Sequence, residues 1–348
     1  MNSLRFQFFV AVAVALLAAA SPQAAERSNP RIATSGDGYL VIWNENDAIY
    51  GVRLNGAGHR LDSPRLIATG SATDVVWSGG TYIVGYKASP KTIASVSVTA
   101  NGDVGSAAVV MENVRDCDAV ELAATSTSLI LSTGSGHRIL SHATGEVREE
   151  RGAYACGPLA VAAGDDSFTI SRVLDGHIIW RSYSAAGASI TGCCVTIGDP
   201  PPEDPFALAL ASDGSNYFHA YTRANGLHAS GQRQRILWSV LFDHPLGAPR
   251  ASWDGAQYVV TVASDRTLHL TRFDASVVPL GSPIAVEPMR AGEAADIAAH
   301  RDGRGAVVWI RENGDVRAGL FDVASLAAGT PFKLMTDVNR STRRRAVR

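Results

Sequence analysis

Short apolar runs separated by glycine-containing turns recur along the chain. The stretch ATSGDGYLVIW (33–43) places such a turn between two apolar runs, and variants return as VWSGGTYIVGY (76–86) and SWDGAQYVVTV (252–262). The first run of each unit recurs at intervals of 40 to 47 residues, and the seven units begin near Ile32, Val75, Val120, Ala160, Ala207, Arg250 and Ile297. A period of this size is typical of repeat architectures in which each unit is one supersecondary structure.

Each unit carries four such runs, which we interpret as four β-strands. Third runs such as ASVSVT (94–99) alternate apolar and polar positions, whereas second runs such as YLVIW (39–43) are continuously apolar and fit strands buried on both faces. A single four-stranded sheet with two apolar faces cannot bury both, but seven sheets around an axis cover one another. The sequence therefore predicts an all-β fold, a seven-bladed β-propeller of four-stranded antiparallel blades, as a single domain over residues 30–336.

The turns that lead into the second strands share a G-x-G/D-x-Y-x-V pattern. It occurs as GDGYLV (36–41), as GGTYIV (79–84) and, less well, as DGAQYVV (254–260). With this pattern the chain resembles secreted bacterial seven-bladed β-propeller repeat proteins over residues 30–335. The resemblance implies the architecture only, because the Trp-Asp pairs and the S-x-D-x-G-x-T-W box of better-known propeller families are absent from the sequence.

The six tryptophans fall at matching places in pairs of units. Trp43 and Trp309 end second runs, Trp77 and Trp253 end first runs, and the remaining two lie in third runs. We expect all six to pack between neighbouring sheets, since large aromatic side chains dominate core packing. Sugar stacking would require an exposed indole.

The first 25 residues have the pattern of a secretory signal peptide. Arg5 precedes an apolar run from Phe8 to Ala20, and small residues allow cleavage after Ala20 or Ala25. The run is shorter than the roughly 20 residues that span a bilayer. We expect an exported protein, secreted or periplasmic, without a transmembrane segment. A formal net charge of −2 gives no whole-protein reason to expect nucleic acid as a partner.

Export to an oxidising compartment would allow the four cysteines to form disulfides. Cys117 and Cys156 hold matching positions in successive units and are one candidate pair, while the adjacent Cys193 and Cys194 could pair or stay as thiols. No C-x-x-C spacing occurs, so no metal site is predicted. Outside the repeats, GDPPPEDP (198–205) is expected to be an extended acidic loop, and the basic tail 337–348 to be disordered.

Charged residues stand where several first strands begin. They are Arg31, Asp74, Asp118 and Asp296, with Glu121 just inside the third unit. In propellers that resemble this one, ligands usually bind on the face built by the loops that lead into first strands and by the loops between second and third strands. These side chains could bind a ligand there, or they could cap turns, as aspartate commonly does.

Three histidines occupy the loops between second and third strands. His137 and His177 hold the same position in adjacent units, and His228 lies close to it in the next. Histidine in a loop can act as an acid or base near neutral pH, but these three could equally be surface residues without a role.

Motifs of known chemistry are missing: the chain has no zinc-protease pair, phosphate-binding loop, nucleophile elbow or complete calcium loop. We therefore predict an exported interaction or ligand-binding module, expected to be monomeric and without a cofactor, whose partner is a protein or a glycan. The alternative is a lyase- or hydrolase-type enzyme that uses His137 or His177 as the base with Asp118 as its partner. Fold alone does not decide between them.

Overall fold

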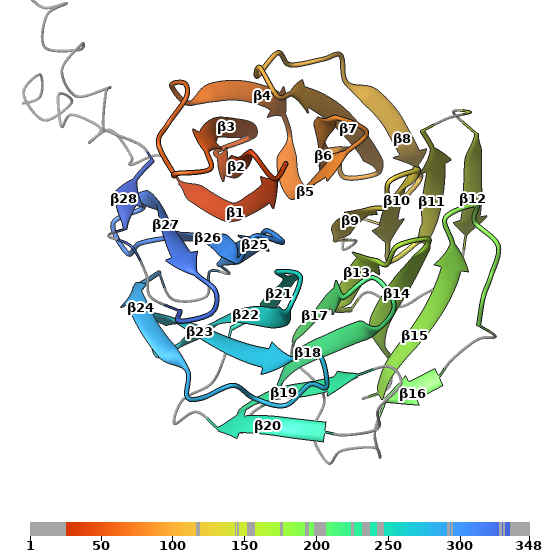
Figure 1. Cartoon of the computed structure of the whole chain (residues 1–348). Coiled ribbons are helices and arrows are strands. Elements are labelled where there is room, and N and C mark those ends of the chain that lie inside the picture. The colour runs from red at the N-terminus through yellow and green to blue at the C-terminus, as the bar shows by residue number, and fades with distance from the viewer. Residues whose placement is uncertain are drawn as a thin grey trace, which may run out of the picture.

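The described part of the chain is built from β-strands arranged in a ring (Figure 1). The computed structural model describes residues 26–115, 119–142, 144, 146–151, 157–174, 177–191, 195–197, 207–223, 226–231, 237–241, 247–290, 293, 295–326, 329 and 331–334. Within these ranges, twenty-eight strands form seven sheets of four antiparallel strands. The predicted seven-bladed β-propeller is confirmed. No helix in these ranges is long and apolar enough to cross a membrane.

Within each blade, the four strands follow one another in chain order from the axis to the outer rim. The first strands lie nearest the axis: β1 (Arg27–Thr34), β5 (Ser71–Ser78), β9 (Val120–Ala124), β13 (Leu159–Ala163), β17 (Ala207–Ser212), β21 (Arg250–Trp253) and β25 (Asp296–Ala299). The second strands follow: β2 (Gly38–Glu45), β6 (Thr81–Ser89), β10 (Ser128–Thr133), β14 (Ser167–Leu174), β18 (Tyr217–Arg223), β22 (Gln257–Ser264) and β26 (Arg304–Ile310).

The two outer strands of each blade complete the sheet. The third strands are β3 (Ala48–Asn55), β7 (Thr92–Thr99), β11 (Gly136–Ser141), β15 (His177–Ser184), β19 (Gly226–Gly231), β23 (Thr267–Asp274) and β27 (Val316–Asp322). The fourth, outermost strands are β4 (Arg65–Thr69), β8 (Ala108–Glu112), β12 (Val147–Arg151), β16 (Val195–Ile197), β20 (Leu237–Leu241), β24 (Ile284–Pro288) and β28 (Phe332–Lys333).

The glycine turn quoted above joins β1 to β2, as its pattern predicts. Thr34 pairs with Tyr39 across the hairpin, and the backbone N–H of Ser35 donates to the carbonyl of Gly38 at 2.9 Å. Gly36 has a φ of 93°, which glycine adopts without steric cost. Because every blade has this order, all seven first turns lie on one face of the propeller, which we call the turn face.

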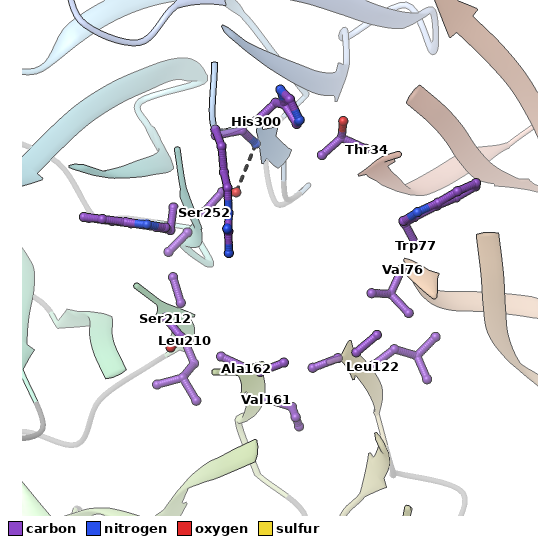
Figure 2. Close-up of a pocket in the computed structure, with 18 of the residues that line it drawn as sticks. Thr34, Val76, Trp77, Leu122, Val161, Ala162, Leu210, Ser212, Ser252 and His300 are labelled. Atoms are coloured by element: carbon purple, nitrogen blue, oxygen red, sulfur yellow. Dashed lines mark hydrogen bonds between the residues drawn. The ribbon is translucent and has the colours of Figure 1, made fainter. Parts of the chain in front are cut away.

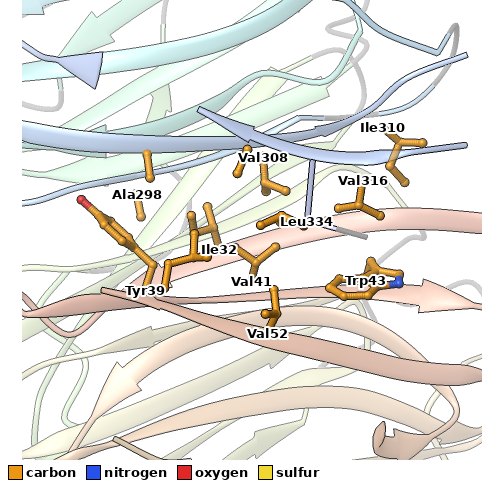
Figure 3. Close-up of a cluster of buried hydrophobic side chains, with 13 residues drawn as sticks. Ile32, Tyr39, Val41, Trp43, Val52, Ala298, Val308, Ile310, Val316 and Leu334 are labelled. Atoms are coloured by element: carbon orange, nitrogen blue, oxygen red, sulfur yellow. The ribbon is translucent and has the colours of Figure 1, made fainter. Parts of the chain in front are cut away.

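Seven apolar clusters fill the seven spaces between neighbouring blades. Figure 3 shows the cluster between the first and last blades, where Val41 and Trp43 of β2 face Val308 and Ile310 of β26. Trp43 and Trp309 are completely buried in such clusters, as expected from the sequence. Each sheet thus buries both faces against its neighbours, which a single blade could not do.

Among the described strands, none is exchanged between the first and last blades. The first blade uses β1 to β4 and the last uses β25 to β28, each in chain order. Side chains join the two blades instead: Arg27 Nη1 donates to the carbonyl of Gly314 at 3.1 Å, and Arg60 Nη1 donates to the carbonyl of Leu334 at 2.8 Å. Closure therefore depends on interactions between blades and not on backbone pairing across the seam.

Candidate binding site in the central channel

The hairpin registers define one equivalent position on each first strand. Thr34 in the first blade, Trp77 in the second and their counterparts pair with the residue that follows the first turn. Three residues earlier along each first strand lies a set that we call the channel ring: Arg31, Asp74, Glu121, Ala160, Ala209, Arg250 and Asp296. Five of these seven positions carry ionisable side chains, and all five belong to strands that line the axis.

One ion pair crosses the channel at this level. Arg250 Nη1 lies 3.0 Å from both carboxylate oxygens of Glu121, and the two side chains are 16% and 11% exposed. They come from the sixth and third blades, which are as far apart as two blades can be in a ring of seven. The pair therefore bridges the channel.

The two aspartates of the channel ring make the same contact with the next blade. Asp74 Oδ2 accepts from the backbone N–H of Leu122 at 2.7 Å, and Asp296 Oδ2 accepts from that of Ile32 at 2.8 Å. In both cases the donor directly follows the channel-ring residue of the next blade. The second of these bonds joins the last blade to the first, so a channel-ring residue also helps to close the propeller.

Burial and neighbouring charges set the protonation of the ring. Burial, followed by the neighbouring Glu121 carboxylate, raises the pKa of Asp74 to about 8, against the opposite effect of Arg250 and Arg31. Burial would lower the pKa of Arg250, but the carboxylates of Glu121, Asp296 and Asp74 outweigh it and raise that pKa. With Asp74 protonated at pH 7, two arginines balance two carboxylates.

A cavity of about 470 Å³ begins one residue beyond the channel ring and opens toward the turn face (Figure 2). All seven blades line it. Its inner wall is aliphatic, with Val76, Leu122, Val161 and Leu210, and hydroxyl groups of residues such as Thr34 and Ser212 stand closer to the mouth. A cavity of this size with a few polar groups on apolar walls is typical of small-molecule sites.

Two tryptophans line this cavity from blades that stand nearly opposite each other in the ring, and Figure 2 shows one of them, Trp77. Trp77 of the second blade and Trp253 of the sixth are half-buried. Behind them, Tyr82 and Tyr258 hold the indoles, with ring centroids 4.7 and 4.5 Å away. The sequence led us to expect all six tryptophans in the core. These two do pack against the apolar clusters between blades, and each also lines the cavity, because the first strands border open space at the axis.

The other residues singled out from the sequence lie elsewhere. His137 is buried between blades, with its ring centroid 4.3 Å from that of Tyr183. His228 is also buried, 2.8 Å from Ser239 Oγ, and burial followed by Arg223 lowers its pKa to about 4. His177, at the start of β15, is half-buried. None of the three histidines lines the cavity.

Several predictions fall outside the described residues. These are Asp118, the cysteines Cys117, Cys156, Cys193 and Cys194, the segment 198–205, the signal peptide 1–25 and the tail 337–348. Within the described ranges, no group of three or more histidine, cysteine, aspartate or glutamate residues has the geometry of a metal site.

Sequence reasoning found four of the five charged members of the channel ring but missed Arg250. Arg250 begins the first run of the sixth unit, whereas all six other units begin with valine, isoleucine or alanine. An arginine in place of an apolar residue at a strand start was the available signal. The sequence could not show that Arg250 meets Glu121, since 129 residues separate them.

Comparisons with known proteins support the architecture. No protein-family model matches the sequence, and no curated protein sequence does. Among solved structures, the BP39L lectin from Burkholderia pseudomallei is 12% identical with a TM-score of 0.71, and the match covers 90% of this chain and 99% of the lectin. This similarity shows a shared fold.

Two further solved structures agree with this. The β-propeller domain of the Trilobed protease from Pyrococcus furiosus, described as having an open velcro topology, is 15% identical with a TM-score of 0.55, over 90% of this chain and 98% of that domain. PorZ, a bacterial surface component of the type-IX secretion system of Porphyromonas gingivalis, is 11% identical with a TM-score of 0.57, over 90% of this chain and 39% of PorZ. The architectural resemblance inferred from the sequence is therefore confirmed.

Proposed function

We propose that this protein is an exported binding module that holds a saccharide in the cavity at the turn-face end of its central channel. The observation that carries the proposal is the pair of half-buried indoles, Trp77 and Trp253, on the wall of a cavity lined by all seven blades. Indole rings present flat apolar surface to the C–H face of a sugar. The hydroxyls of Thr34 and Ser212 are already bonded to backbone groups of their own turns. Ser252 Oγ accepts the backbone N–H of Ala299 and can still donate to a sugar hydroxyl.

Two features favour binding over catalysis. The buried carboxylate Glu121 is held by Arg250, and Asp74 and Asp296 accept backbone N–H groups. The histidines that the enzyme alternative needs lie away from the cavity. The lectin with this fold shows that such a ring can serve in glycan binding, although its sequence is only 12% identical.

The proposal is tested by screening the purified protein, without its first 25 residues, against an array of defined oligosaccharides. The best glycan is then titrated in solution while tryptophan fluorescence is recorded. We expect Trp77→Ala and Trp253→Ala each to weaken binding about tenfold or more, since truncating an aromatic anchor in a binding site commonly costs about 2 kcal/mol.

Trp180→Phe is the matched control, because Trp180 is buried in the fourth blade and does not line the cavity. Thermal unfolding of each variant separates lost binding from lost folding. The proposal fails if no glycan binds, or if folded Trp77 and Trp253 variants bind as the wild type does. Export is tested separately, by fractionating cells that express the full chain.

A further inference from the structure

We infer that the cavity binds acidic saccharides, with Arg301 on its wall as the cation that holds the carboxylate of the sugar. This inference rests on the proposed saccharide binding and names the class of sugar that the site takes. Three observations carry it: the charge of the cavity wall, the lack of a partner for Arg301 among the described residues, and the packing that fixes the turn on which Arg301 lies.

The wall of the cavity carries positive charge and no negative charge. Among the described residues that line it, none is an aspartate or a glutamate, and Arg301 is the one lysine or arginine. The two arginines of the channel ring, Arg31 and Arg250, do not line the cavity, and Arg250 is held by Glu121. A carboxylate that enters the cavity therefore meets a guanidinium group and no like charge on the wall.

The side chain of Arg301 is available to a ligand. Within the described part of the chain, its guanidinium group makes no hydrogen bond or ion pair. Arg304, three residues further on, is committed instead: its Nε donates to Asp302 at 2.6 Å and its Nη1 to the carbonyl of Gly56 at 3.3 Å. Because a guanidinium group can hold a carboxylate through two parallel hydrogen bonds, Arg301 suits an acidic sugar.

The carboxylates of the neighbouring turns are engaged elsewhere. Asp302 is bonded to Arg304 and lies 3.0 Å from Nδ1 of His300. Asp254, in the first turn of the sixth blade, accepts two backbone N–H groups of its own turn, both at 2.7 Å. Neither aspartate lines the cavity, so neither occupies the place of a ligand carboxylate beside Arg301.

The turn that carries Arg301 is packed between both neighbouring blades. On one side lies Gly255 of the sixth blade, where an added Cβ would stand 3.3 Å from the Cα and the Cβ of Arg301. On the other side, the ring of His300 lies against the first blade, with Nε2 only 2.8 Å from the place of a Cβ on Gly36 (Figure 2). The backbone of Arg301 is thereby held in place before a ligand arrives, which lowers the cost of binding.

The arrangement of the wall gives an acidic sugar one favoured orientation. Arg301 of the seventh blade, with Ser252 and Trp253 of the sixth, places charge, a hydroxyl and an indole on neighbouring blades. The wall of the third and fourth blades is aliphatic, with residues such as Leu122 and Val161. A sugar ring stacked on Trp253 can therefore direct its carboxylate to the seventh blade, where its charge is balanced.

The glycan array tests this inference when it includes matched pairs. Each pair consists of an oligosaccharide that ends in a uronic or sialic acid and the same oligosaccharide with the carboxylate converted to a carboxamide. We expect the acid to bind about tenfold or more tightly than the amide at low salt, since hydrogen bonds between charged partners are the stronger ones. The difference should shrink in 0.5 M salt, because the cavity is open to solvent. Equal binding of acid and amide overturns the inference.

Substitutions at Arg301 then locate the preference. Arg301→Gln should reduce the difference between acid and amide to about twofold or less and leave binding of the amide unchanged. Arg301→Lys should keep part of the difference, because it retains the charge but not the two-pronged geometry. The control is Lys91→Gln, which removes a positive charge from an exposed turn between β6 and β7 on the opposite face and should change neither ligand. A folded Arg301→Gln variant that binds the acid as the wild type does also overturns the inference.

The outcomes separate this inference from the proposed function. If acid and amide bind equally and Trp253→Ala weakens both, the saccharide site stands and the preference for acidic sugars is wrong. If Lys91→Gln lowers the preference as much as Arg301→Gln does, the preference comes from the overall charge of the protein and not from the cavity. If neither acidic nor neutral glycans bind, the proposed function fails, and this inference fails with it.

Discussion

Removing the carboxylate of Glu121 should destabilise the propeller, because it leaves Arg250 without its ion-pair partner inside the channel. The two groups are 3.0 Å apart and only 11% and 16% exposed. Breaking one partner of a fully buried pair costs about 3–5 kcal/mol. With this residual exposure, we expect Glu121→Gln to lower the free energy of unfolding by about 2–3 kcal/mol.

The same reasoning makes the effects of the two residues non-additive. Arg250→Met removes the guanidinium and leaves Glu121 uncompensated, so it should also destabilise. The double variant Glu121→Gln/Arg250→Met contains neither charge, and its loss should be smaller than the sum of the single losses by about 1–3 kcal/mol. Double-mutant cycles of this kind isolate the interaction between the two side chains.

The assay is urea unfolding at pH 6, followed by far-UV circular dichroism. We chose this pH because Asp74 is protonated there in the wild type. Raising the salt concentration should change the coupling little, since a pair shielded inside the channel is screened weakly. Strict additivity of the two single variants, or a coupling that vanishes in 0.5 M salt, would refute the bridge across the channel.

Two further predictions concern pH. The pKa of Asp74 is about 8 in the folded protein and 3.8 ordinarily, so the unfolded chain loses this proton first and the free energy of unfolding should fall as pH rises from about 4 to 8. Asp74→Asn should remove that fall. If the difference in unfolding free energy between wild type and variant is the same at pH 5.5 and pH 8.5, the prediction is wrong. Burial lowers the pKa of His219 from 6.5 to about 3, so the free energy of unfolding should fall as pH drops below 6.5, by about 2 kcal/mol at pH 5. The His219→Gln variant should lose less unfolding free energy than the wild type between pH 7.5 and pH 5. Urea unfolding of both proteins at these two pH values measures the difference.

The blades could be predicted from the sequence because their cause is local. The repeated turn places residues such as Gly36 where only a residue tolerant of positive φ fits without strain, and the flanking runs pair as a hairpin across it. The continuous apolar character of YLVIW indicated a strand covered on both faces, and Val41 and Trp43 are indeed completely buried. These signals lie within about ten residues of one another.

The binding site was only partly predictable. Arg31, Asp74, Glu121 and Asp296 were found because charge is unusual at the start of an apolar strand. The contacts of these residues could not be predicted, because their partners lie in other blades. Asp74 accepts a hydrogen bond from Leu122 in the next blade, and Asp296 accepts one from Ile32 at the opposite end of the chain. The three histidines attracted attention as loop residues, yet His137 and His228 are buried beside the tyrosines Tyr183 and Tyr221.

By itself, the sequence determined the number of blades, the order of their strands and the hairpin registers, because period, turn chemistry and apolar patterning act over short distances. The tertiary structure alone decided which strand edges meet at the axis. Trp43 and Trp77 both end apolar runs, but the first is enclosed between two sheets while the second borders the cavity. That difference, like the pairing of Arg250 with Glu121, arises only when seven blades close into a ring.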